Sequence, residues 1–160
     1  MAPKAAVASS RTDKVLRRVE VKPLKVFVDD RGHLFEGLRR DDAIFGGVFG
    51  QTLVTTIFPG VVKGWHKHEK QTDYTLCAVG NVKYCTAYEE PGKPLRIETF
   101  YLGEQSQSLI KVPPGVWHGY TPIGNQPAVL VHLMDTVFDP NDTQRKDPLA
   151  FGDVWTVKSG

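Results

Sequence analysis

Three of the five histidines of this 160-residue chain stand, with one aspartate, in a spacing that could support chemistry. One residue separates His66 from His68, Asp73 follows in the same stretch, and a later Pro-x-Gly-x-x-His segment ends at His118. Because side chains alternate along a strand, His66 and His68 share one face. Paired imidazoles, with a carboxylate and a third imidazole from a neighbouring hairpin, can move protons or bind a metal. The spacing predicts a site at the mouth of a β-barrel.

The elements that must position these side chains are short β-rich runs separated by turn signals. Glycine (15 residues) and proline (11 residues) are frequent, as expected for many strands and turns. The runs expected to form strands are Leu24–Val28, Gly50–Phe58, Val61–His66, Asp73–Val79, Asn81–Ala87, Leu95–Leu102, Ser108–Val112 and Ala128–Asp135. Asp41–Phe45 and the stretch after Pro140 look helical or irregular. Strands at this spacing predict an all-β sandwich or jelly roll. Residues 1–14 are expected to form a flexible arm, and residues 15–160 a single domain.

Composition excludes several classes of protein. A mass of 17.8 kDa fits one domain, and 41% hydrophobic with 24% charged residues excludes a disordered chain. A net charge of +2, spread along the chain, argues against a nucleic-acid partner. No apolar run approaches the roughly 18–20 residues that cross a bilayer, so no membrane partner is expected. Cys77 and Cys85 are too few and too close for a disulfide scaffold, which predicts a cytoplasmic protein with reduced thiols.

The histidine pattern, framed by Gly60 and Gly80, resembles the two motifs of the cupin superfamily. Over about Phe27 to Trp155 the chain also resembles the dTDP-4-dehydrorhamnose 3,5-epimerase family. The segments that carry this resemblance are Asp30-Arg31-Gly32, Phe35-Glu36, Gln51, Val62-Lys63-Gly64-Trp65-His66, Gln71, Val112 to Gly119, Asp139-Pro140, Asp147-Pro148 and Trp155. It implies a cupin jelly-roll barrel (a double-stranded β-helix) and a cytoplasmic nucleotide-sugar epimerase or isomerase. It further implies a dTDP-linked 4-keto-6-deoxy sugar as substrate, no cofactor, and a homodimer that pairs through N-terminal strands.

Epimerisation next to a ketone needs a base on one face of the sugar, a stabiliser for the enolate oxygen and an acid on the other face. The resemblance makes His66 the base, which suits a neutral imidazole, and Asp147 its carboxylate partner. The family acid is a tyrosine, and His132 stands in its place. His132 therefore either donates the second proton, with a pKa near 6–7 if unperturbed, or is a packed core histidine.

The resemblance also implies residues that bind the substrate. Glu36 and Gln51 would line the nucleotide end of the pocket, and Arg31, Lys63 and His118 remain as candidates to bind the diphosphate. The chain departs from the family at other positions: Asp73 replaces a lysine, Glu90 an arginine and Leu53 an asparagine. The first two exchanges replace positive charge in the site by negative charge.

Two alternatives stay open. The first is a metal-dependent cupin, such as an oxygenase or isomerase, in which His66, His68, Asp73 and His118 hold one divalent transition metal. The replacement of the family lysine by Asp73 favours this hypothesis. The second is a cupin that binds sugar without catalysis. The first alternative and the epimerase exclude each other at His66, because a metal-bound nitrogen has no lone pair left to accept a proton.

Overall fold

The structure, a computed structural model, describes residues 18–157, and within this range the chain forms strands and turns but no helix. The strands are β1 (Glu20–Pro23), β2 (Val26–Asp29), β3 (Gly32–Phe35), β4 (Gln51–Ile57), β5 (Lys63–His68), β6 (Asp73–Val79), β7 (Asn81–Tyr88), β8 (Arg96–Gly103), β9 (Ser108–Val112), β10 (Trp117–Pro122), β11 (Ala128–Met134) and β12 (Thr143–Arg145). The arm expected over residues 1–14 lies outside the described residues. In the described part, no helix is long and apolar enough to span a membrane.

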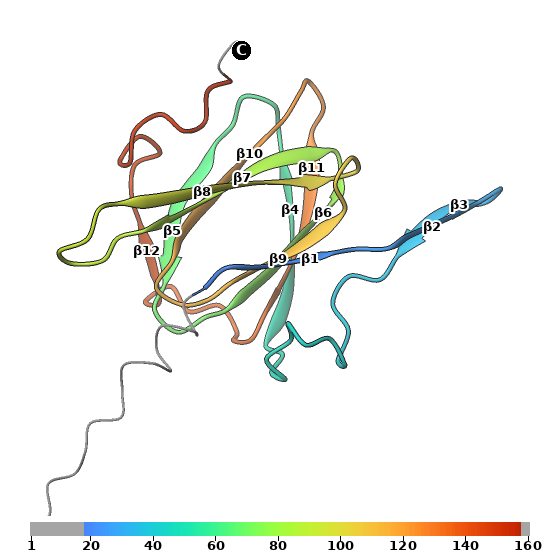
Figure 1. Cartoon of the computed structure of the whole chain (residues 1–160), viewed down its shortest axis with the longest axis horizontal. Helices are drawn as coiled ribbons and strands as arrows, with labels where there is room; N and C mark the ends of the chain where they lie inside the picture. Colours follow the sequence, from blue (N-terminus) through green and yellow to red (C-terminus); the bar gives the residue numbers. More distant parts are fainter. Residues whose placement is uncertain (1–17, 158–160) are drawn as a thin grey trace, which may run out of the picture.

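Two five-stranded antiparallel sheets make up the body. One has the order β1-β9-β6-β11-β4 and the other β12-β5-β10-β7-β8, and the β2–β3 hairpin projects away from both (Figure 1). The core between the sheets takes side chains from each, including Ile110, Leu130 and Tyr84. Along β11 buried and less buried residues alternate strictly, as expected for a strand with one face against this core. The predicted all-β jelly roll is confirmed.

A second apolar cluster covers the outer face of the sheet that contains β5. Trp65, Trp117 and Trp155 are buried there, together with Cys85 and Ala87. The indole nitrogens of Trp65 and Trp155 both donate to the carbonyl oxygen of Pro148, at 3.0 and 2.7 Å. These contacts hold the segment after β12 against the sheet. Trp65 therefore points outward, which leaves His66 and His68 pointing into the barrel, as alternation predicts.

The predicted strands between Asp73 and Val112 agree with the structure to within one residue at each end. The predicted strand Leu24–Val28 is wrong as a single element. The chain leaves the sheet after Pro23, the amide of Leu24 donates to the carbonyl of Gln107, and a separate strand begins at Val26. The segment Asp41–Phe45 forms turns rather than a helix.

Candidate active site

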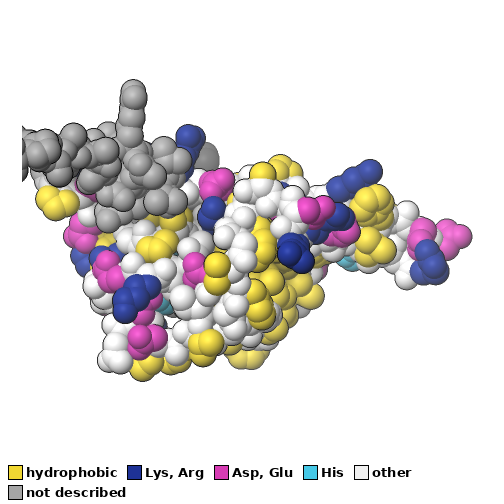
Figure 2. Space-filling model, turned by 90° about the horizontal axis from the view of Figure 1, so that it is seen from below, with side chains coloured by type: hydrophobic (Ala, Val, Ile, Leu, Met, Phe, Trp, Pro, Cys, Tyr) yellow, Lys and Arg dark blue, Asp and Glu magenta, His cyan; other side chains and the backbone are white. Residues whose placement is uncertain are grey.

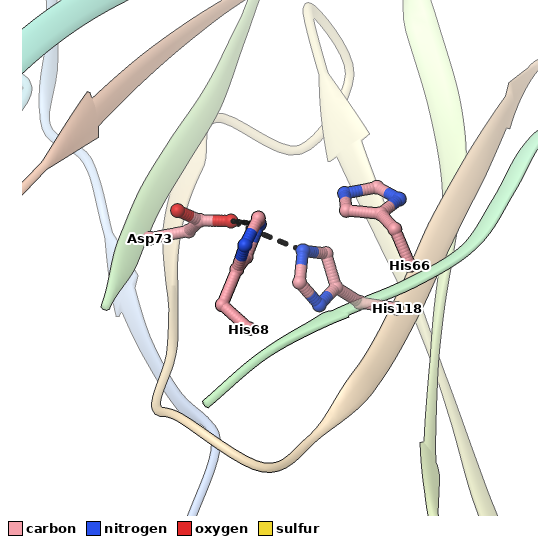
Figure 3. A group of neighbouring side chains, drawn as sticks. All are labelled: His66, His68, Asp73 and His118. Atoms are coloured by element: carbon pink, nitrogen blue, oxygen red, sulfur yellow. Dashed lines mark hydrogen bonds and ion pairs between the residues drawn. The ribbon is translucent and has the colours of Figure 1, made fainter. Parts of the chain in front are cut away.

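A cavity of about 460 Å³ opens between β5 of one sheet and β4 and β11 of the other. This volume suits a small-molecule ligand. Of the residues expected from the sequence to act on a substrate, Gln51, Lys63, His66 and His132 line the cavity. His68 and Asp73 line it as well, and the ring of His118 lies beside that of His66, toward Asp73 (Figure 3).

The four residues expected to form a cluster do so. His66 and His68 come from β5, Asp73 from β6 and His118 from β10, and one ligand atom of each lies within 4.8 Å of the others. Nε2 of His118 is 3.0 Å from Oδ2 of Asp73, and Nε2 of His68 is 3.6 Å from the same oxygen. Because β6 and β10 belong to different sheets, the Asp73–His118 bond joins the two halves of the barrel.

Neighbouring polar groups orient this cluster. Nδ1 of His118 lies 3.0 Å from the carbonyl oxygen of Val116, and Nδ1 of His68 lies 3.3 Å from Oγ1 of Thr143. Both rings therefore turn Nε2 toward Asp73. Burial opposes ionisation of Asp73, but hydrogen bonds from His118 and Gln71 and the neighbouring imidazoles outweigh it and lower the pKa of this carboxyl group. The aspartate is a carboxylate at neutral pH.

His66 packs edge-on against His118, with ring centroids 4.0 Å apart. Burial, and then the neighbouring His118 and His68, lower the pKa of His66 well below its ordinary value, and the charge of Arg145 adds to this effect. The ring is therefore neutral at pH 7 and has a lone pair that can accept a proton. It keeps part of its surface open to the cavity.

His132 faces His66 from the other sheet and is also neutral. Burial lowers its pKa from 6.5 to about 4. Its Nδ1 lies 3.0 Å from Oγ1 of Thr75, while its buried Nε2 has no hydrogen-bond partner among the described residues. As an imidazolium, His132 could donate a proton only at acidic pH. The ring lines the cavity in its neutral form.

A shift in strand register brings Lys63 into the site. β10 pairs His118 with His66, but then Tyr120 with Lys63, so β5 has one extra residue between the two pairs. Strict alternation would place Lys63 on the face opposite His66. The shift is possible because the backbones approach closely at Gly119, where a Cβ atom would meet the Lys63 carbonyl oxygen at 2.7 Å.

The turn between β5 and β6 fixes the distance from His68 to Asp73. The buried carboxylate of Asp142 accepts hydrogen bonds from the backbone amides of three successive residues in this turn, at 3.0–3.3 Å: Glu69, Lys70 and Gln71. Hydrogen bonds to a charged acceptor are about twice as strong as neutral ones. Asp142 thus anchors the segment that links two members of the cluster.

The structure does not bring the other expected residues to this cavity. Arg31 is at the exposed tip of the β2–β3 hairpin and pairs with Asp29, and Glu36 is exposed and pairs with Arg39. Asp147 does not contact His66 in the described structure. Its exposed carboxylate accepts the backbone amide of Leu149 at 2.8 Å, the turn-forming role that an Asp-Pro pair often has.

Sequence reasoning missed Arg145, which lines the cavity from β12 beside His66. β12 has three residues, too few for a periodic pattern, so no sequence signal identified it. Arg145 and Lys63 form no ion pair with the described residues, whereas Lys146, which also lines the cavity, is bonded to Glu89. The cavity therefore carries two cations that are free to bind an anion.

The comparisons with known proteins place the chain in a family. A profile of the polysaccharide biosynthesis C-terminal domain family matches residues 27–145. The chain belongs to this family. It is 33% identical over 127 residues to the probable low-salt glycan biosynthesis epimerase Agl13 of Haloferax volcanii, covering 78% of this chain and 81% of that protein. It is also 33% identical over 130 residues to the spore coat polysaccharide biosynthesis protein SpsL of Bacillus subtilis, covering 80% and 85%.

Solved structures share this fold. The dTDP sugar isomerase of Desulfovibrio desulfuricans G20 superimposes with a TM-score of 0.79 at 22% identity, over 88% of this chain and 91% of that chain. ChmJ, a 3′-monoepimerase of Streptomyces bikiniensis in complex with dTDP-quinovose, gives 0.73 at 20% identity, over 82% and 70%. The dTDP-4-dehydrorhamnose 3,5-epimerase of Elizabethkingia anophelis gives 0.72 at 19% identity, over 89% and 84%. These likenesses confirm the predicted jelly-roll fold, and the curated relative named an epimerase confirms the resemblance to sugar epimerases inferred from the sequence.

The buried, neutral His132 predicts a loss of stability in acid. Its pKa is about 4 in the folded protein, against an ordinary histidine value of 6.5. Between these values the unfolded chain binds more protons, so the free energy of unfolding decreases as the pH falls through this window. The shift corresponds to a loss of about 3 kcal/mol in the free energy of unfolding once the pH has fallen through the whole window.

Chemical denaturation at about pH 7 and about pH 4.5 should show a smaller pH dependence of the free energy of unfolding for His132→Gln than for wild type. An unchanged dependence in His132→Gln, equal to that of the exposed control His33→Gln, would contradict this origin.

Proposed function

We propose that this protein is an epimerase or isomerase that acts on a dTDP-linked 4-keto-6-deoxy sugar by abstracting a proton next to the ketone. The observation that carries the proposal is His66, a neutral imidazole that faces the cavity, in a chain whose curated relative is named a glycan biosynthesis epimerase. A neutral imidazole is the usual side chain for proton abstraction near neutral pH.

The charge of the cavity supports a nucleotide-linked substrate. Lys63 and Arg145 present positive charge at its wall, although the chain lacks the family's lysine and arginine at Asp73 and Glu90. Arg145 can bind phosphate oxygens through two parallel hydrogen bonds, whereas Lys63 acts as a point charge. Solved relatives of this fold bind dTDP or dTDP-quinovose. We propose that the two cations bind the diphosphate and that Gln51 contacts the nucleotide end.

Removing the base should abolish proton exchange without abolishing binding. In heavy water, with dTDP-4-keto-6-deoxyglucose as substrate, the wild type should incorporate deuterium next to the ketone. His66→Ala and His66→Asn should lower the exchange rate by at least about 100-fold, the usual minimum contribution of a general base. Both variants should still bind dTDP in calorimetry, because Lys63 and Arg145 remain.

Lys93→Ala, at an exposed residue in the turn between β7 and β8, serves as the control and should exchange deuterium like wild type. Exchange at the wild-type rate in His66→Ala would remove His66 as the base. Wild-type protein that binds dTDP but exchanges no deuterium would instead indicate the non-catalytic sugar-binding cupin.

One observation favours a second candidate function, a metal-dependent cupin. His66, His68, Asp73 and His118 bring their ligand atoms within 4.8 Å of one another. The Nδ1 contacts of His68 and His118 turn both Nε2 atoms toward Asp73, the arrangement by which outer groups usually orient metal ligands. Three imidazoles and a carboxylate suit a divalent transition metal, which would supply a Lewis acid or a redox centre.

Metal content separates the two functions. Elemental analysis of protein purified without a chelator or a metal-binding tag should find no stoichiometric metal if His66 is the base, and the metal-free protein should remain active. Near-stoichiometric metal that disappears in His68→Ala would support the metal-dependent cupin. It would also contradict the assignment of His66, because a bound nitrogen cannot accept the substrate proton.

The isolated hairpin supports a homodimer. A two-stranded hairpin alone is marginally stable in water, yet β2 and β3 pair only with each other. Val28 and Leu34 on this hairpin are 77% and 60% exposed, and Val54 on the edge strand β4 is 60% exposed. Apolar side chains also gather on the face of the body next to the hairpin (Figure 2). In a dimer in which a second copy covers these residues, Arg31 at the tip of the hairpin would lie against the partner and away from the cavity of its own chain.

Light scattering should therefore give the mass of a dimer at micromolar concentration. Val28→Asp, placed at the most exposed apolar position of the hairpin, should shift the protein toward monomer, whereas Val137→Asp, at an exposed valine outside the hairpin, should not. A monomer whose mass does not change with concentration would contradict the dimer.

A further inference from the structure

Inversion at carbon requires a proton donor on the wall opposite the base. His66 approaches the cavity from β5, so the donor must reach it from the side of β4, β6 or β11. Side chains from these three strands that line the cavity are Gln51, Leu53, Thr55, Asp73, His132 and Met134. None of them is a suitable acid at neutral pH. Asp73 is ionised and bonded to His118, His132 is neutral, and an aliphatic hydroxyl or an amide is too weak an acid.

Tyr120 reaches this opposite wall from the other sheet. It lies on β10, two residues after His118, and it lines the cavity. Its hydroxyl group is hydrogen-bonded to Thr55 on β4 of the other sheet, which shows that the side chain extends across the barrel. The ring lies 5.8 Å from the ring of His132, centroid to centroid. The phenol therefore occupies the region next to His132, across the cavity from His66.

We propose that the hydroxyl group of Tyr120 donates the second proton, and that His132 lines the site as a neutral ring without donating one. This proposal rests on the proposed function and names the acid of the same site. Charged and titratable neighbours of the phenol are Lys63 on β5, Tyr84 on β7, Asp73 on β6 and His132 on β11. A phenol has an ordinary pKa of about 10, so this hydroxyl carries its proton at neutral pH.

The other tyrosines of the chain have different surroundings. Tyr84 is buried in the core and does not line the cavity, and Tyr74 accepts the amide of Gly46 at 2.8 Å. Tyr88 is bonded to Glu98, and Tyr101 is 59% exposed. Tyr120 is thus the one tyrosine among the described residues whose side chain lines the cavity.

The proton transfers balance. His66 removes the proton from the carbon next to the ketone, and the C–H electron pair becomes the enolate. Tyr120 then gives its O–H proton to the opposite face of that carbon, which regenerates the ketone and leaves a phenolate. The imidazolium of His66 releases its proton to water, and the phenolate takes one from water. The enzyme returns to its starting state with no oxidant or metal required.

The decisive experiment compares exchange with inversion in Tyr120→Phe. With dTDP-4-keto-6-deoxyglucose in heavy water, the variant should still exchange deuterium at a rate near that of wild type, because His66 is intact and returns the label to the same face. Formation of the epimer, read by NMR, should fall by at least about 100-fold. Tyr74→Phe, which loses a buried hydroxyl group with a hydrogen bond away from the cavity, should keep both rates.

Three outcomes would overturn the assignment of Tyr120. These are epimer formation near the wild-type rate in Tyr120→Phe, an equal loss of exchange and epimerisation in that variant, or loss of inversion alone in His132→Gln. Failure of the proposed function is distinguishable, because wild-type protein would then neither exchange deuterium nor form epimer. Binding of dTDP by each variant, measured by calorimetry, verifies that the cavity is folded.

Discussion

One buried hydrogen bond, from His118 to the carboxylate of Asp73, joins the two sheets where the cavity forms. A buried carboxylate without donors would cost several kcal/mol, so each partner depends on the other. Gln71 donates to the second oxygen of Asp73 at 2.6 Å, and the Val116 carbonyl lies against the far side of the His118 ring. His66 then packs on His118. The position of His66 thus follows from a polar contact that the apolar core alone would not provide.

This network is compatible with proton transfer and with metal binding. The two differ in whether the lone pair of His66 is free to accept a proton or is bound to a metal. If Nε2 of His118 remains bonded to Asp73, His66 is an unbound neutral base beside a bonded pair. If a metal replaces that bond, the same four side chains become its ligands and His66 loses its basicity. The outer contacts of the cluster, to Val116 and Thr143, suit both arrangements. What favours the proton-transfer chemistry is the 33% identity of this chain to a protein named a probable glycan biosynthesis epimerase.

Strands with one buried face were predictable because their side chains alternate. This rule predicted most of the strands of the barrel and the fact that His66 points into it. β10 was not predicted, since nearly all of its residues are buried, between the core and the tryptophan cluster, and show no alternation. The same missed strand carries Tyr120. The role expected for Lys63 depends on a register shift that no alternating pattern contains. Arg145 and Asp147 lie where the chain is too irregular for periodicity, so their positions required the structure.

The charges of the cavity are arranged by depth, and this arrangement orients a substrate. Lys63 and Arg145 are exposed, whereas His132 is buried and neutral, and the charge of Asp73 is already compensated by His118. An unpaired charge costs much free energy in the buried part of the cavity but little at its rim, where water solvates it. In the proposed function, the diphosphate would therefore bind at the mouth and the uncharged keto sugar inside, next to His66. A lysine base at that depth would need a counter-ion, whereas an imidazole enters the reaction neutral and becomes charged only as the enolate forms beside it.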